Sequence, residues 1–162
     1  MLMIKHKYVL SVDPSINYCG MAIHRRNGDL VVYKLLRPSS KSDDHLKKSR
    51  NIYNQVQVLL NTYPKTQLII ECPQYWGAAG YLARESGALF KLTFLCGMLF
   101  SLSDDVIAVT PNDWKHQLPK HVVNNRLRKI YPDIDIANTD HNIVDAIGIG
   151  HLYLTKYKKV TS

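Results

Sequence analysis

The sequence predicts an α/β fold in which a mixed five-stranded sheet carries helices on both faces. Three apolar runs come first, at residues 8–12, 20–23 and 30–36, and a turn separates each run from the next. Two further apolar runs, at 67–72 and 106–109, alternate with segments of helical periodicity. Three antiparallel strands followed by two strands that alternate with helices are typical of a mixed sheet between two helical layers.

Local signals support each predicted strand. The run at 8–12 is short, contains β-branched residues and is closed by Asp13 and Pro14, as expected of a buried strand. Asn27-Gly28 separates the second run from the third and is a strong hairpin signal, so these two strands should pair antiparallel. The run at 67–72 is apolar without alternation, which is expected where helices cover both faces of a sheet.

Two long helices are expected in the middle of the chain. The first should begin near Asp43 and Asp44 and end at Tyr63, before Pro64. The second should span residues 81–102, and its second half is apolar nearly all round, so it must be covered on more than one side. Either the core buries all of that surface, or a second subunit covers part of it. The apolar face of the first helix consists of Leu46, Ile52, Val56, Leu59, Leu60 and Tyr63.

Three more helices complete the expected order. A short helix should begin at Thr110, which is an N-cap candidate followed by Pro111. Another should cover residues 121–131, and residues 138–140 should cap a last helix that ends near Lys158. No repeat, low-complexity tract or linker interrupts the sequence, so we expect one domain over residues 1–162.

The amino-acid composition indicates which class of partner the protein binds and in which cellular compartment it functions. The chain has 162 residues, with 21 Lys and Arg against 13 Asp and Glu, and a formal charge of +8. That excess favours nucleic acid as a partner, although a generic basic protein could carry the same charge. The three cysteines form no CxxC pair, so we expect no zinc site, no disulfide framework and a reducing compartment. The first strand begins too early for a signal peptide and no stretch suits a membrane, so we expect a cytoplasmic or other DNA-containing compartment, not secretion.

Two acids end apolar strands. Asp13 follows the first run, and Glu71 follows Leu68-Ile69-Ile70 in the fourth, just before a turn at Pro73. A buried strand seldom ends in an isolated acid, because an ionised group there needs a partner. Taken alone, Asp13 is explained by an Asx-turn with the backbone of Ser15 or Ile16. The second acid, and a third on the last helix, favour a shared site instead.

The third acid is Asp145. His141 lies four residues before it and therefore shares its helix face, and Asn142 lies on the same side. Asp140 is roughly 140° away around the helix, so we interpret it as a cap rather than a ligand. Small residues would let this helix lie close to the sheet and would bring Asp145 towards the strand ends: Ala146, Gly148 and Gly150.

Three carboxylates gathered in this way suit magnesium. Magnesium prefers hard oxygen ligands and keeps several waters, so Asp13, Glu71 and Asp145 would suffice to hold it. Two ions about 4 Å apart would activate a water on one side of a phosphodiester and stabilise the leaving oxygen on the other. Without cations, the three carboxylates would raise one another's pKa. His141 is either a further ligand, or a guide for the attacking water, or an ordinary surface histidine.

Five segments, taken together, resemble a known family. They are VLSVDPSINYCGMAI with Asp13, LIIECP with Glu71, ALFKLTFLCGML, TPNDWK, and HNIVDAIGIG with Asp145. Each is loose alone, but they are spread over nearly the whole chain and stand in the family's order. The chain in this way resembles the RuvC-type Holliday-junction resolvases of the ribonuclease H-like superfamily.

The resemblance implies a fold and an activity. It implies a ribonuclease H-like fold and a homodimeric crossover-junction endonuclease that nicks opposed strands of a four-way DNA junction. The products would carry 5′-phosphate and 3′-hydroxyl ends, and each site would use two Mg²⁺ ions, with Mn²⁺ as a substitute. Many members carry an Asp or His ligand three residues before the last acid. This chain has Asn142 there, so whether His141 or Asn142 completes the metal site stays open.

Basic residues in two segments are predicted DNA contacts. In similar proteins a lysine after the fifth strand assists at the scissile phosphate, and Lys115 matches that place. Lys120 matches a second basic position, and Arg126 follows on the helix at 121–131. The alternative for both lysines is that they are ordinary phosphate contacts, each of which contributes to salt-dependent affinity.

Aromatic residues suggest a further contact. Tyr75 and Trp76 stand where relatives present an aromatic ring to unstacked junction bases, and stacking of this kind is worth about 1–3 kcal/mol per base. Packing over the loop is the alternative for both. Trp114, directly before Lys115, is predicted to be a core residue.

Other functions remain compatible with the sequence. One alternative is another nuclease of the same fold that acts on flaps, other branched DNA or RNA–DNA hybrids, since fold does not decide substrate. A nucleic-acid-binding relative without catalysis is a second alternative, although the presence of all three acids argues against it. An actin-like ATPase would need a longer chain and a second domain.

Overall fold

The computed structural model describes residues 6–39, 44–73, 85–116 and 118–158. Its five strands form one sheet in the order β3-β2-β1-β4-β5. β1 pairs antiparallel with β2 and β2 with β3, whereas β4 runs parallel to β1 and β5 parallel to β4. The predicted mixed sheet, three antiparallel strands followed by two more, is therefore confirmed. The strands are β1 Tyr8–Pro14, β2 Cys19–Arg25, β3 Leu30–Leu36, β4 Thr66–Glu71 and β5 Val106–Val109.

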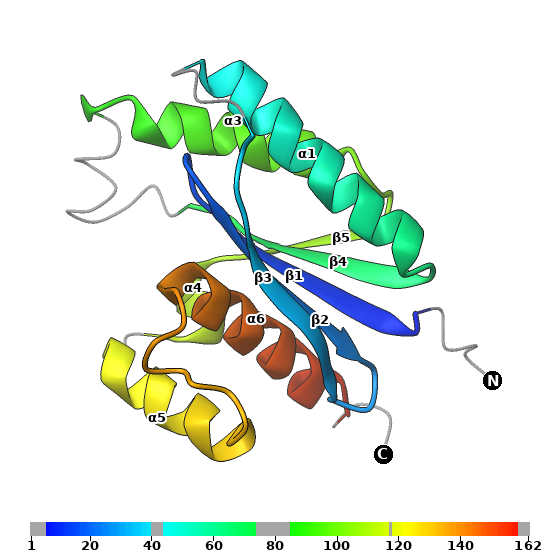
Figure 1. The fold of residues 1–162 in the computed structure, drawn as a ribbon, viewed down its shortest axis with the longest axis vertical. Coiled ribbons are helices and arrows are strands. Elements are labelled where there is room, and N and C mark those ends of the chain that lie inside the picture. Colours follow the sequence, from blue (N-terminus) through cyan, green and yellow to red (C-terminus); the bar gives the residue numbers. More distant parts are fainter. Residues whose placement is uncertain (1–5, 40–43, 74–84, 117, 159–162) are drawn as a thin grey trace.

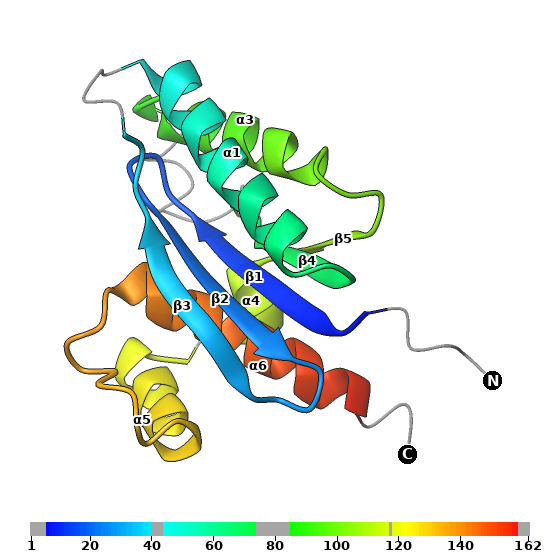
Figure 2. The same cartoon turned by 45° about the vertical axis from the view of Figure 1, so that its right-hand side comes forward.

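Helices cover both faces of the sheet, as predicted (Figure 1). On one face lie α1 (His45–Thr62) and α3 (Ala88–Phe100). On the other lie α4 (Pro111–Trp114), α5 (Lys120–Ile130) and α6 (His141–Lys158). Figure 2 shows α6 crossing beneath β1 and β2, with α5 on its outer side. None of the described helices is long and apolar enough to cross a membrane.

The alternation of side chains in β1 builds a separate core on each face. Leu10 and Val12 are fully buried on the α1–α3 side, where they pack with Ile52 and Leu99. Val9 belongs to the core on the α6 side. Because both faces of β1 are buried, this strand has to be apolar at successive positions, which is the pattern that the sequence shows.

The last helix lies unusually close to the sheet. A Cβ atom added at Gly20 of β2 would lie 1.9 Å from the backbone oxygen of Asn142, and one added at Gly150 would lie 2.8 Å from Ser11 Oγ. The Ser11 hydroxyl donates to the backbone oxygen of Ala146 at 2.6 Å. The prediction that small residues let this helix approach the sheet is confirmed at Gly150, whereas Gly148 faces the Trp114 side chain instead. The close approach fixes the position of the first turns of α6.

The predicted helix at 81–102 is not continuous, because it is interrupted at Gly87. Gly87 has φ 69°, in the left-handed region that ends regular helix, and α3 begins at Ala88. Residues 81–84 lie outside the described residues. The apolar face predicted for α1 holds from Ile52 onward, but Leu46 in its first turn is 49% exposed because the helix start projects beyond the sheet.

The second half of that predicted helix is not wholly buried. Leu89, Leu95 and Leu99 of α3 are in the core, but Phe90 is 75% exposed and Phe94 is 39% exposed. Burial of every apolar side chain of this helix within one molecule is therefore wrong. The two exposed rings lie four residues apart and share one helix face.

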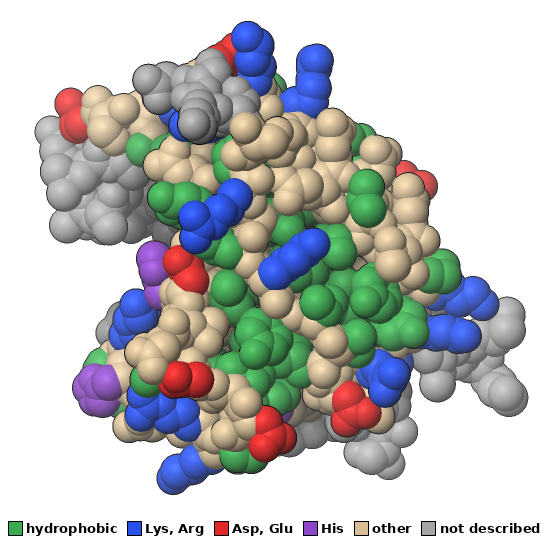
Figure 3. Space-filling view, in the orientation of Figure 1, with side chains coloured by type: hydrophobic (Ala, Val, Ile, Leu, Met, Phe, Trp, Pro, Cys, Tyr) green, Lys and Arg blue, Asp and Glu red, His purple; other side chains and the backbone are tan. Residues whose placement is uncertain are grey.

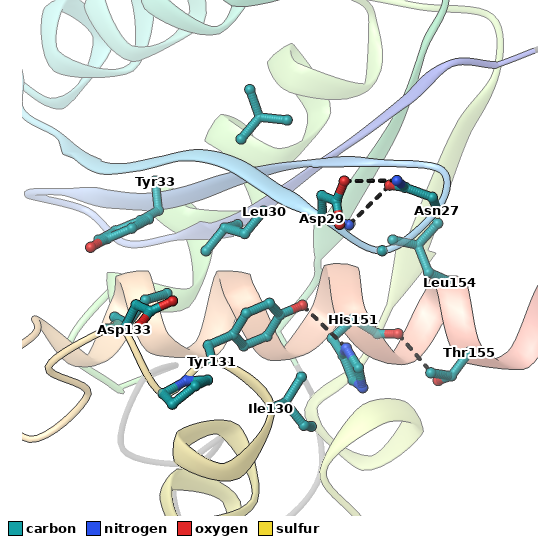
Figure 4. Close-up of a pocket in the computed structure, with 14 residues that line it drawn as sticks. Asn27, Asp29, Leu30, Tyr33, Ile130, Tyr131, Asp133, His151, Leu154 and Thr155 are labelled. Atoms are coloured by element: carbon teal, nitrogen blue, oxygen red, sulfur yellow. Dashed lines mark hydrogen bonds between the residues drawn. The ribbon is translucent and has the colours of Figure 1, made fainter.

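A groove of about 700 Å³ opens between the β2–β3 hairpin, the end of α5 and α6. Figure 3 shows hydrophobic side chains gathered over the middle of this side of the molecule. Inside the groove the Tyr131 hydroxyl lies 3.2 Å from His151 Nδ1 (Figure 4). The hairpin is at the end of β2 that pairs with the start of β1, so the groove and Asp13 lie at opposite ends of these strands.

Candidate active site

Two of the three predicted acids come from neighbouring parallel strands. Val12 of β1 pairs with Ile70 of β4, and Asp13 and Glu71 are the next residue on each strand. Because the carboxyl ends of parallel strands meet at the same edge of a sheet, the two acids lie at one edge. Asp13 also pairs with Gly20 of β2, the residue against which α6 rests.

The third acid comes from α6, the helix held against this edge. Asp145 directly precedes Ala146, whose backbone oxygen accepts the hydrogen bond from Ser11. At the helix start, Asp140 Oδ1 accepts from the backbone N–H of Asn142 at 2.9 Å, so the predicted capping role of Asp140 is confirmed. The cap and the Ser11 hydrogen bond together determine where α6 presents Asp145.

Burial and like charge act together on Asp13. Its side chain belongs to a residue only 8% exposed. Burial, first, and then the negative charges of Glu71 and Asp145 raise the pKa of Asp13 to about 8, although Lys115 opposes them. No hydrogen bond joins Asp13 to Ser15 or Ile16 among the described residues. The Ser15 N–H donates instead to the Tyr18 backbone oxygen at 2.8 Å, so the Asx-turn is not formed.

The pKa of Glu71 is also raised. Burial raises its pKa, the negative charge of Asp145 adds to this effect, and Lys115 and Trp114 reduce it. The three carboxylates therefore lie near enough to influence one another electrostatically. That is the behaviour expected of an anionic site whose positive charge is incomplete.

Lys115 supplies positive charge at this site. Its Nζ lies 2.8 Å from Asp145 Oδ2 and 4.7 Å from the centre of the Trp114 ring. Burial acts to lower the pKa of Lys115, but the hydrogen bond and charge of Asp145, followed by the charges of Glu71 and Asp13, outweigh burial and raise the pKa. The lysine consequently stays protonated at neutral pH.

Trp114 has a polar contact that the sequence did not reveal. The residue is 7% exposed, so its predicted place in the core is confirmed. Its indole N–H also donates a hydrogen bond to Glu71 Oε2. The order Trp114-Lys115 hints at proximity to the site, but no local pattern indicates that the indole reaches a residue 43 positions away.

The structure does not gather His141 with the three acids. The imidazole is 61% exposed, and its Nδ1 lies 3.9 Å from Asp140 Oδ1. Asn142 is buried, and its side-chain amide donates to the same oxygen at 3.1 Å. Both fourth-ligand candidates therefore interact with Asp140 in this conformation.

The chemistry of the donor set fits a cation that prefers oxygen. Asp13, Glu71 and Asp145 offer only carboxylate oxygens, the ligands that magnesium and manganese favour. Across the described ranges, however, no three His, Cys, Asp or Glu side chains are already close enough to hold an ion. In this structure Glu71 accepts a hydrogen bond from Trp114, and Asp145 accepts one from Lys115.

The predicted DNA contacts divide into described and undescribed residues. Lys120 is the first residue of α5 and is exposed. Arg126 is exposed one to two turns later and lines a cavity of about 230 Å³ together with Trp114 and Lys115. Tyr75 and Trp76 lie outside the described residues.

Comparison with known proteins gives a structural match. No protein-family model matches the sequence, and the comparison with curated proteins found no match. One similar solved structure is Thermus thermophilus RuvC in complex with a Holliday junction substrate, with TM-score 0.76, 17% identity and coverage of 97% of this chain and 98% of that chain. Another is the Thermus thermophilus RuvC structure, with TM-score 0.72, 15% identity and coverage of 95% and 97%. The fold is therefore the ribonuclease H-like fold of RuvC.

Proposed function

We propose that this protein is a structure-selective endonuclease that resolves four-way DNA junctions by hydrolysing phosphodiester bonds. The observation that carries the proposal is the meeting of Asp13, Glu71 and Asp145 at one edge of the sheet. The fold adds support, because a protein with the same fold has been solved with a Holliday junction substrate. The formal charge of +8 suits a polyanionic partner.

The three carboxylates are the proposed holders of Mg²⁺ or Mn²⁺. When bound, the metal would supply an activated water and stabilisation of the leaving oxygen. The raised pKa of Asp13 supports the need for positive charge there. His141 remains a proposed fourth ligand, and its imidazole would have to turn away from Asp140 to take that role.

Lys115 is the proposed phosphate contact within the site. Its ammonium is fixed between Asp145 and the Trp114 ring and is protonated, so it can donate to a non-bridging oxygen of the scissile phosphate. Lys120 and Arg126 would extend the contact along the backbone of the DNA arms. Each phosphate contact of this kind makes affinity fall with salt.

Two copies of the chain would supply the paired incisions. A two-fold dimer holds two identical sites in a fixed relation, which matches the symmetry of a four-way junction. Each site would nick one of two opposed strands and leave 5′-phosphate and 3′-hydroxyl ends. Tyr75 and Trp76 are proposed to stack on bases that unpair at the junction centre.

A cleavage panel tests the function. We would incubate the protein with Mg²⁺ and four labelled substrates: a four-way junction, a flap, an RNA–DNA hybrid and a linear duplex. Symmetric cleavage of the junction alone is the expected result. Preferred cleavage of the flap or the hybrid would assign a different nuclease on the same fold, and binding without any cleavage would assign a non-catalytic relative.

Removal of single carboxylates tests the site. We expect Asp13→Asn, Glu71→Gln and Asp145→Asn each to abolish cleavage and to leave junction affinity within about threefold of the unmodified protein. Each change removes a proposed metal ligand but leaves the basic surface intact. Single-turnover cleavage and gel-shift affinity would be measured on the same preparations. Asp133→Asn, an exposed acid outside the site, is the matched control. Near-normal cleavage by any of the three variants would exclude that residue.

A further inference from the structure

Trp114 joins two parts of the candidate site. Its indole N–H donates to Glu71 on β4, and the face of its ring carries the Lys115 ammonium, which in turn contacts Asp145 on α6. Carboxylates from two separate elements are thus held by two consecutive residues, the last residue of α4 and the Lys115 that caps its C-terminus. A core tryptophan needs a partner for its N–H, but the partner here is one of the proposed metal ligands.

The fold leaves the Trp114 ring little freedom. At the start of α4, the Thr110 N–H donates to Asp113 Oδ2 at 2.7 Å, which fixes the turn that carries the ring. On α6, a Cβ atom added at Gly148 would lie 2.6 Å from Trp114 Cζ3, so the ring fills the space left by that glycine. An indole packed in this way holds its N–H in one direction.

We propose that Trp114 is a positioning residue, whose indole N–H sets the orientation of the Glu71 carboxylate for metal binding. This inference rests on the proposed function. The hydrogen bond occupies Glu71 Oε2, which leaves the second oxygen of this carboxylate as the available ligand. A hydrogen bond to an ionised acceptor is stronger than one between neutral groups, so it can determine the rotamer of a partly buried glutamate.

The expected loss of metal affinity in a Trp114 variant can be estimated from other residues that hold a metal ligand in place. Residues that hold a metal ligand without touching the metal typically change metal affinity or activity by roughly 10- to 100-fold when they are replaced. Trp114→Phe keeps an aromatic ring against Gly148 and beneath Lys115 but deletes the N–H. We therefore expect metal affinity to fall about tenfold or more, while junction affinity stays within about twofold.

The experiment measures metal binding directly. Mn²⁺ would be titrated calorimetrically into the full chain and into Trp114→Phe, without DNA, and junction cleavage would be followed over a range of metal concentrations. Cleavage by the variant should be slow at limiting metal and recover towards the normal rate at saturating metal. Tyr131→Phe is the control, because it also removes a side-chain hydrogen bond, but one in the groove of Figure 4.

A second measurement leaves Trp114 in place. The chain has two tryptophans, so Trp76→Phe leaves Trp114 as the single indole fluorophore. Addition of Mn²⁺ should change its emission with the midpoint found by calorimetry. This result does not depend on whether Trp114→Phe folds.

The outcomes separate this inference from the proposed function. Unchanged metal affinity in Trp114→Phe, or an indole emission that does not respond to Mn²⁺ in a protein that binds it, would overturn the positioning role. Slower cleavage at every metal concentration, with unchanged metal affinity, would reduce Trp114 to a packing residue. A full chain that neither binds Mn²⁺ nor cleaves any junction would instead remove the proposed function.

Discussion

The Asp13 carboxyl is difficult to ionise in the metal-free protein. Burial alone disfavours its ionised form, and the charges of Glu71 and Asp145 act in the same direction. Lys115 opposes them but is shared with both other acids. A fold that needed only stability would not place an acid there, because an apolar residue would avoid the penalty. This electrostatic cost is consistent with the proposal that a cation binds at the site and stabilises the ionised form of Asp13.

The pKa of Asp13 makes the stability of the metal-free protein depend on pH. The folded value is about 8 and the ordinary value is 3.8, so between these the folded protein retains a proton that the unfolded chain has released. The free energy of unfolding should therefore fall as pH rises from about 4 to about 8. Asp13→Asn removes this loss, so the variant should become more stable than the unmodified protein, by up to a few kcal/mol near pH 8.

Urea unfolding at several pH values, in buffer with a chelator, would measure this difference. The gap between the two proteins should widen towards pH 8 and narrow again when Mg²⁺ is added. Parallel stability curves for the two proteins across that range would show that Asp13 is not the titrating group.

His141 and Asn142 are expected to respond differently to replacement. His141 is exposed, so His141→Ala should slow cleavage with little change in unfolding temperature if the imidazole acts at the site. Asn142 is buried and its amide contacts the capping residue Asp140, so Asn142→Ala should mainly lower stability. Loss of a buried hydrogen bond of this kind typically costs about 1–3 kcal/mol.

Cleavage rates and thermal midpoints for both variants, with Asp140→Asn beside them, would distinguish these roles. We expect the His141 variant to be the slowest of the three at saturating metal. A slower Asn142 or Asp140 variant of normal stability would transfer the fourth position away from His141.

At the scale of elements, the site depends on how closely α6 approaches the sheet. The backbone of α6 packs directly against Gly20, which has no side chain. The Ser11 hydroxyl donates a hydrogen bond to the backbone oxygen of Ala146, next to Asp145. Side chains at position 20 would separate the helix from β2, and Asp145 would move with it. The distance between Asp145 and the strand acids is therefore set by a glycine that carries no functional group.

Gly20→Ala tests this dependence. The new Cβ would lie 1.9 Å from the backbone oxygen of Asn142, and neither backbone can rotate away as a side chain could. Overpacking of this kind should lower the free energy of unfolding by roughly 3 kcal/mol and should also slow cleavage. Stability and single-turnover cleavage would be measured together.

Gly97→Ala is the matched control. Gly97 lies in α3, and a Cβ atom there would meet nothing within 4 Å. The same substitution should therefore raise stability by roughly 0.5–1 kcal/mol, as alanine does in helix interiors. Equal behaviour of the two alanine variants would contradict the role assigned to Gly20.

The elements were predictable from the sequence where the signal was local. Asn27-Gly28 gave the hairpin, with Gly28 at φ 107°, and uninterrupted apolar runs gave the buried strands. The helix predicted at 81–102 is interrupted at Gly87, where the backbone takes φ 69°, and no proline in the sequence marks that interruption. The spacing of apolar residues predicts which side chains face the core, but it does not predict where a helix is interrupted.

The candidate site was predictable only in part for a related reason. Strand ends and helix spacing indicated Asp13, Glu71 and Asp145 because each position follows from one element. The contact between Trp114 and Glu71 depends on how α4 packs against both β4 and α6, so no local pattern predicts it. Likewise, helix spacing placed His141 on the face of Asp145, but its exposed side chain interacts with Asp140 instead.

At the scale of the whole molecule, the two helical layers have different outer surfaces. The α4–α6 layer holds the charged site, whereas the opposite layer exposes Phe90 and Phe94 on one face of α3. Large exposed aromatic side chains grouped on one face are uncommon in monomers and often mark an interface. We therefore expect α3 to form part of a homodimer interface, which the paired incisions would also require.

Phe90→Glu tests the assembly. A charge in place of the 75% exposed ring would be desolvated in an interface and should shift the protein towards monomer, whereas a solvated surface would tolerate it. Val58→Glu is the control, because Val58 is also an exposed apolar residue, at 62%, but lies on α1. Sedimentation equilibrium at micromolar protein and moderate salt would report the mass of each.

The cleavage pattern connects assembly with function. If the dimer supplies both sites, Phe90→Glu should lose paired incision within the lifetime of a bound junction, and Val58→Glu should keep it. Single and paired incision can be distinguished with a supercoiled plasmid that extrudes a cruciform. One nick relaxes this plasmid, whereas two simultaneous nicks on opposed strands linearise it. An unmodified protein that stays monomeric when bound to a junction, or a Phe90→Glu variant that still linearises the plasmid, would contradict the interface and the paired mechanism based on it.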